Sequence, residues 1–99
     1  ETILDRLEHG SESQYKAALI EADAFADEVL RSMSFGGANM KERLEGMKSH
    51  HLETKPELEI AHALRNRIIN DPTMTLTRAE AEENLEHYKL FFREIELFS

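Results

Sequence analysis

Four motifs that begin α-helices recur along the chain, and their spacing constrains the fold more than any other feature. In each one a Ser, Thr or Asn precedes a Glu or Gln by three residues. In this capping-box pattern the two side chains satisfy the first free backbone N–H groups of a helix. The pairs are Ser11 with Gln14, Asn39 with Glu42, Thr54 with Glu57, and Thr77 with Glu80. They predict helices over about 11–34, 40–49, 54–70 and 78–98.

The residues between these motifs favour helix ends. Gly36-Gly37 follows the first predicted helix. Asp71-Pro72 follows the third, because a residue before proline avoids helical angles. Residues 2–9 form a short segment with helical apolar periodicity that ends at Gly10, and no segment alternates as a β-strand would. We therefore expect an all-α protein: an antiparallel four-helix bundle with a short extra N-terminal helix, in one domain over 1–99. The chain begins without Met, which suggests a fragment of a longer protein.

The helix predicted over 11–34 has apolar residues on two sides. The main arc contains Tyr15, Ala18, Leu19, Ala22, Phe25, Ala26, Val29, Leu30 and Met33. Ala17, Ile20 and Ala24 form a weaker stripe opposite. The last predicted helix has an apolar arc of Ala81, Leu85, Tyr88, Phe91, Phe92, Ile95 and Phe98, with Leu90 and Leu97 opposite it. Monomeric proteins rarely expose apolar patches of this kind. The pattern therefore predicts a homodimer, or alternatively an upstream segment of a longer chain that covers these residues.

Arg65 is a charged residue inside an apolar arc. The arc of its helix contains Leu58, Ala61, Leu64, Ile68 and Ile69. A guanidinium does not lose its charge, so when it faces a core it needs a carboxylate, a phosphate or water. Glu21 and Asp23 in the first long helix are candidate partners for a structural ion pair. A bound phosphate is the alternative, and the residues around Arg65 are then a ligand site.

The Arg65-Asn66 pair, followed by Asn70-Asp71, resembles the motif of HEPN-type domains. These are small helical bundles of prokaryotic toxin, defence and nucleotide-handling systems. Their motif is an Arg, usually with a polar residue after it, and a His four to six residues later. The resemblance implies metal-free RNA cleavage, often in a site shared across a dimer. In it the Arg holds the phosphate, and the His moves a proton between the ribose 2′-hydroxyl and the leaving oxygen.

Asn70 occupies the place of that His, and an amide cannot act as a general acid or base near neutral pH. The resemblance therefore implies a non-catalytic binding or interaction module that holds a phosphate, nucleotide or RNA group through Arg65, Asn66 and Asn70. More loosely, residues 20–30, 39–44 and 76–97 resemble a family of uncharacterised bacterial helical domains.

Two further interpretations stay open at this point. His62 lies one helical turn before Arg65, so it is a candidate substitute base, and the chain would then be a metal-independent RNase. Alternatively Arg65 forms only an ion pair, Asn70 ends its helix, and the protein is a purely structural dimerising bundle. RNA cleavage, and a nucleotide-induced shift in melting temperature, distinguish the three.

Several classes of protein are unsupported by the composition. The chain has no cysteine and a net charge of −8, which argue against a disulfide framework, a thiolate zinc site and a DNA-binding protein. Glu59 and His62 form one Glu-x-x-His step, but di-iron bundles use two, so we expect no metal and no cofactor. No run approaches the about 18 apolar residues of a membrane span. We expect a cytoplasmic protein, or the cytoplasmic part of an anchored one.

Overall fold

The structure is a computed structural model that describes residues 12–33, 35–46 and 52–98. Residues 97 and 98 are described by their backbone alone. Its helices are α2 (Glu12–Ser32), α3 (Met40–Glu45), α4 (Lys55–Asn70) and α5 (Arg78–Phe98). The described ranges contain no strand, which confirms the all-α class. The helix predicted over 2–9 and the capping residue Ser11 lie outside these ranges.

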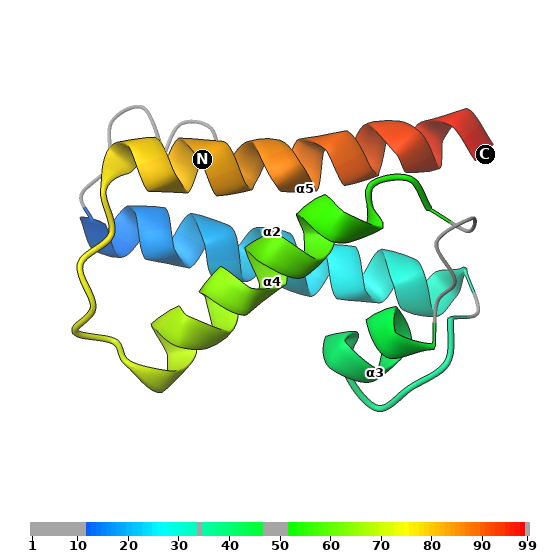
Figure 1. Cartoon of the computed structure of the whole chain (residues 1–99), viewed down its shortest axis with the longest axis horizontal. Coiled ribbons are helices and arrows are strands. Elements are labelled where there is room, and N and C mark those ends of the chain that lie inside the picture. Colours follow the sequence, from blue (N-terminus) through cyan, green and yellow to red (C-terminus); the bar gives the residue numbers. More distant parts are fainter. Residues whose placement is uncertain (1–11, 34, 47–51, 99) are drawn as a thin grey trace.

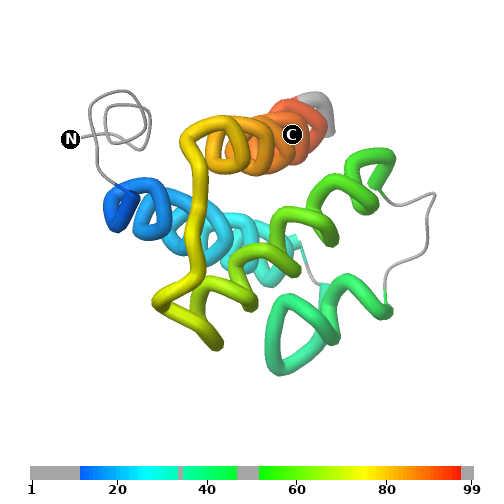
Figure 2. Tube along the Cα trace, turned by 60° about the vertical axis from the view of Figure 1, so that its left-hand side comes forward, coloured from blue at the N-terminus to red at the C-terminus, as the bar shows by residue number. Residues whose placement is uncertain are grey.

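The two long helices α2 and α5 lie side by side, and α4 crosses them (Figures 1 and 2). The backbone N–H of Leu76, just before α5, donates to Glu12 at the start of α2, so these helices run in the same direction. Lys16, near the start of α2, donates to the carbonyl oxygen of Pro72, just after α4, so α4 runs the opposite way. This mixed arrangement differs from the antiparallel order that we expected from the sequence. α3 packs against α2 and α4.

Two of the capping pairs form as predicted. The Asn39 Oδ1 accepts a hydrogen bond from the backbone N–H of Glu42 at 3.0 Å, at the start of α3. At the start of α5 the pair is reciprocal: the Glu80 N–H donates to the Thr77 hydroxyl at 3.1 Å, and the Thr77 N–H donates to the Glu80 carboxylate at 3.3 Å. Both pairs are local in sequence, which is why the sequence alone identified them.

The predicted pairing of Thr54 with Glu57 is wrong, because the Thr54 side chain makes no capping bond to its own helix. Its hydroxyl donates instead to Glu94 of α5 at 2.6 Å, and the backbone N–H groups of Glu53 and Thr54 donate to the same carboxylate. Burial raises the pKa of Glu94, but these hydrogen bonds outweigh it and hold the pKa below its usual value of 4.5. A residue far away in sequence therefore satisfies the backbone N–H groups of the two residues just before α4.

Gly37 explains the turn before α3. Its φ is +145°, and a Cβ there would lie 2.9 Å from the Cβ of Glu42, so a side chain would be strained and would clash. α3 itself ends at Glu45, before the predicted end at 49, and residues 47–51 lie outside the described ranges.

The buried apolar side chains form one core. Its members are Leu19, Ala22, Ala26, Leu30, Met40, Leu44, Leu52, Leu58, Ala61, Leu64, Ile68, Leu76, Ala81, Leu85, Tyr88 and Phe91. The predicted arcs are wrong at Phe25, Met33 and Ile69, whose side chains are 58%, 36% and 46% exposed. Ile69 lies in the last turn of α4 beside Ile68, which is 3% exposed and belongs to the core, so this turn buries one of its two isoleucines and exposes the other. None of the described helices is long and apolar enough to span a membrane.

Candidate functional site

Asp23 is a buried carboxylate that side chains from two other helices contact. Only 3% of the residue is exposed, because it lies on the core-facing side of α2 together with apolar residues. The His62 Nδ1 of α4 lies 3.0 Å from one of its oxygens and 3.2 Å from the other. The Tyr88 hydroxyl of α5 donates to it at 2.7 Å. A buried carboxylate is stable only with partners of this kind, so Asp23 and its neighbours form one unit.

Arg65 belongs to the same unit but is less fully bonded. Its Nε lies 3.5 Å from the second oxygen of Asp23, close enough for an ion pair, but this buried N–H makes no hydrogen bond within the described residues. Its Nη1 donates to the Asn66 Oδ1 at 3.0 Å. One third of the side chain, 33%, is exposed. Of the two predicted ion-pair candidates, Asp23 contacts Arg65, and Glu21 is exposed on α2.

Asn66 connects Arg65 to His62. Its Nδ2 lies 3.2 Å from the His62 Nε2, one helical turn away, while its Oδ1 accepts from Arg65. Three of the predicted site residues, His62, Arg65 and Asn66, therefore form a continuous hydrogen-bonded chain with Asp23. Asn70 is apart from it: it is the exposed last residue of α4.

Tyr88 is a site residue that the sequence did not identify as one. Its side chain is fully buried, and burial raises its pKa far above the usual value, with the charge and the hydrogen bond of Asp23 adding to the shift. Tyr88 therefore stays protonated and acts as a permanent donor to Asp23. In the sequence it was one aromatic residue of an apolar arc, and only its hydroxyl group signalled a need for a buried partner.

A cavity of about 400 Å³ opens beside this unit, between α2, α3 and α4. It is lined by Asp23, Ala24, Asp27, Asn39, Met40, Lys41, His62, Arg65 and Asn66. Its volume is in the range of pockets that bind small molecules, and polar groups from three helices converge on it.

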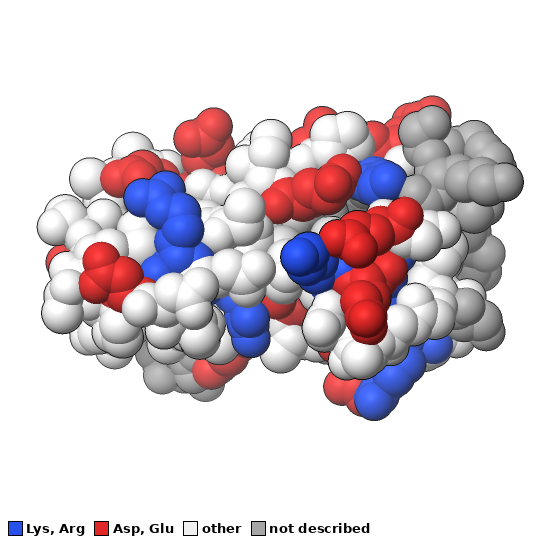
Figure 3. All heavy atoms as spheres, turned by 60° about the horizontal axis from the view of Figure 1, so that its bottom comes forward, with Lys and Arg blue, Asp and Glu red and all other residues white. Residues whose placement is uncertain are grey.

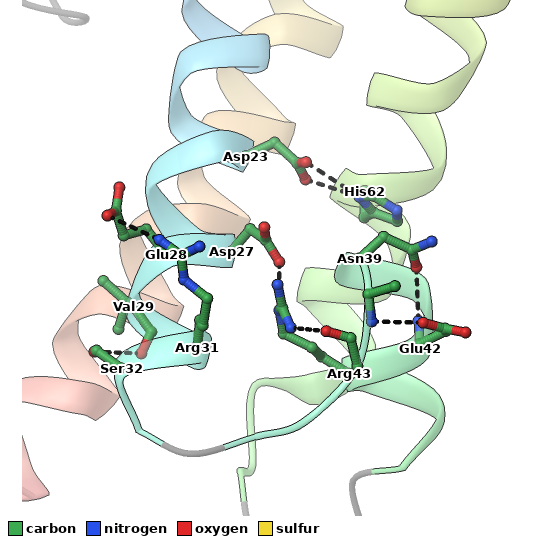
Figure 4. A network of polar contacts seen from close by, with 12 residues as sticks. Asp23, Asp27, Glu28, Val29, Arg31, Ser32, Asn39, Glu42, Arg43 and His62 are labelled. Atoms are coloured by element: carbon green, nitrogen blue, oxygen red, sulfur yellow. Dashed lines mark hydrogen bonds and ion pairs between the residues drawn. The ribbon is translucent and has the colours of Figure 1, made fainter.

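Arg43 holds the α3 wall of the cavity in place. Its Nε donates to Asp27 of α2 at 2.7 Å, and its Nη1 donates to the carbonyl oxygen of Gly37. Figure 4 shows Asp23 and Asp27 on α2 facing His62 of α4 and Arg43 of α3. Only 5% of Arg43 is exposed, and it does not line the cavity. Lys41 and Arg65 are the basic residues that do.

The charges around the cavity are mixed. Lys41 and Arg65 contribute positive charge, while Asp23 and Asp27 contribute negative charge that Arg65 and Arg43 partly neutralise. On the face that Figure 3 shows, basic and acidic side chains are likewise interspersed, with no continuous basic field. A site with this distribution suits one small anionic group better than a long nucleic acid, whose phosphates need a basic surface.

The described part of the chain brings no three His, Cys, Asp or Glu side chains together in a way that could hold a metal ion. Comparison of the chain with protein-family models gives no match, and comparisons with curated proteins and with solved structures give none either. Function is therefore inferred from the cavity and its lining.

Proposed function

We propose that the cavity between α2, α3 and α4 binds a phosphate group, free or as part of a nucleotide or RNA end, in a HEPN-like module without efficient nuclease activity. One observation carries this proposal: Arg65 lines the cavity with its guanidinium held by the ion pair with Asp23, while 33% of its side chain is exposed. An anchored guanidinium loses little side-chain entropy when it binds an oxyanion.

Two further residues of the lining suit an anion. Lys41 of α3 adds a second positive charge, and its side chain is 74% exposed. The Asn39 Oδ1 already accepts from the Glu42 N–H, so its amide N–H groups are left to donate. A phosphate accepts hydrogen bonds on several oxygens, and such charge-assisted bonds are about twice as strong as neutral ones.

Replacing Arg65 with Ala is the direct test. We expect the wild-type chain to bind AMP or inorganic phosphate, which raises its melting temperature, and Arg65→Ala to bind roughly 10- to 100-fold more weakly. This estimate corresponds to one lost hydrogen bond to a charged group, about 1.5–3 kcal/mol. Calorimetric titration measures the affinity directly.

Arg67→Ala is the matched control. Arg67 lies two residues further along α4, is exposed, and is not among the residues that line the cavity. It should bind the same ligands as tightly as the wild type. Equal weakening by both substitutions would show that only general charge matters. No binding by the folded wild-type chain would overturn the proposal and favour a purely structural bundle.

A metal-independent RNase is the second candidate function, and the contact of His62 with Asp23 favours it. A carboxylate on Nδ1 orients an imidazole as a general base. In such a reaction the 2′-oxygen of RNA bonds to phosphorus as the bond to the 5′-oxygen breaks, and His62 carries the proton between the two oxygens. Cleavage of single-stranded RNA above the level of Arg65→Ala would support this candidate. No cleavage above that level would remove it.

A homodimer is part of the proposal. The structure leaves Ala24 exposed and Ile20 half-buried, and Ile20 lines a largely apolar groove with Ala17, Ile68 and Ile69. Leu90 is half-buried, and the side chain of Leu97 lies outside the described part of the chain. A light-scattering mass near twice the 11.4 kDa of one chain is the expected result, and a monomer would contradict it.

A further inference from the structure

The hydrogen-bonded chain of the cavity defines where the proton of His62 lies, and it does so from two sides. A guanidinium only donates, so the Asn66 atom next to Arg65 is the acceptor Oδ1. The Asn66 amide N–H group then faces the His62 Nε2, which must accept. Asp23 independently requires a proton on Nδ1. Both constraints specify the same neutral tautomer of His62, with the proton on Nδ1 and a lone pair on Nε2.

A second proton on His62 is incompatible with this arrangement. The Nε2–H and the amide N–H of Asn66 would both be donors at a distance of 3.2 Å. Asn66 must then turn its Oδ1 toward His62 or move aside, and in either case it releases the Nη1 of Arg65. Asp23 remains in contact with Nδ1, so the imidazolium keeps a buried counter-charge. Protonation therefore frees Arg65 and adds a second cation beside it.

We propose that His62 is the specificity-determining residue of the cavity and favours anions only in its protonated form. The cavity then takes up a proton together with a compact oxyanion, such as an inorganic phosphate or a phosphate monoester. This inference rests on the proposed function, and it adds which protonation state of His62 binds the anion. By linkage, an anion that favours the imidazolium also raises the proton affinity of His62 to the same extent.

Charged groups from several helices lie around His62. Asp23 and Asp27 of α2 line the cavity with it, and Glu45 of α3 and Glu59 of α4 line a second hollow that His62 also lines. The cations beside it are Lys41 of α3 and Arg65 of α4. From α5, the Tyr88 hydroxyl donates to Asp23, which contacts the ring. A bound anion compensates the charge of these two cations and of a protonated ring together, so proton uptake and anion binding favour each other.

Sulfate is the probe for the test, because its charge does not change over the range in which imidazoles titrate. Calorimetric titration from about pH 8 to about pH 5.5 should show affinity that rises as the pH falls, by up to about tenfold per pH unit. Repeating it in buffers of different ionisation enthalpy counts the protons taken up by the wild-type chain, so this readout needs no variant.

His62→Gln should bind sulfate with little dependence on pH, and the matched control His87→Gln, on α5 and not among the residues that line the cavity, should keep the wild-type profile. Sulfate or phosphate binding without proton uptake, or with the same pH profile in His62→Gln, would overturn this inference and leave the proposed function standing. No anion binding at any pH overturns both.

Discussion

Replacing Asp23 with Ala is expected to lower the free energy of unfolding by about 3–5 kcal/mol, as the loss of one partner from a buried ionic cluster does. The residue is 3% exposed and accepts from His62 and Tyr88 while it pairs with Arg65. Without it the Tyr88 hydroxyl, fully inside the core, loses its acceptor. Arg65 loses its counter-charge. Denaturation by urea at neutral pH, followed by circular dichroism, measures the loss.

Glu28→Ala is the control for this prediction, because Glu28 lies on the same helix with a side chain that is 69% exposed, in a surface ion pair with Arg31. Such a surface pair typically contributes within about 0.5 kcal/mol. A comparable effect of the two substitutions would mean that the helix itself, and not the contacts of Asp23, is sensitive to the loss of an acidic residue. A loss below about 1 kcal/mol for Asp23→Ala would show that its cluster adds little to stability.

Phe91→Ala is the second large effect that we expect, again about 3–5 kcal/mol. Phe91 is 0% exposed at the centre of the core, so removing its ring leaves a cavity between α5 and the helices that pack on it. Phe25→Ala makes the same chemical change on a side chain that is 58% exposed and packs against Phe92 with ring centroids 5.1 Å apart.

The loss of the Phe25–Phe92 ring contact should cost only about 1 kcal/mol. Urea denaturation of both variants gives the comparison. If Phe25→Ala destabilised the chain as much as Phe91→Ala, the two rings would be equally buried in solution, and the exposed position of Phe25 would be contradicted.

The sequence by itself determined the helices. α4 and α5 end at the predicted residues, and the Asn39–Glu42 and Thr77–Glu80 caps form, because helix boundaries depend on residues three or four positions apart. Residues at such spacing are neighbours in any helix, however the helices pack together. The sequence also identified Arg65 as a charge that needs a partner, since a permanent cation in an apolar arc is costly wherever the chain places it.

The tertiary structure alone decided which groups meet. Tyr88 bonds to Asp23 across 65 positions, and Glu94 accepts from Thr54 across 40, so neither contact has a local pattern. The parallel course of α2 and α5 was undetermined for the same reason. An apolar arc predicts that one face of a helix is buried. It does not predict which helix packs on that face, or whether the two helices run parallel or antiparallel. Contacts between distant residues depend on how the helices pack, and packing energy is shared by the whole core.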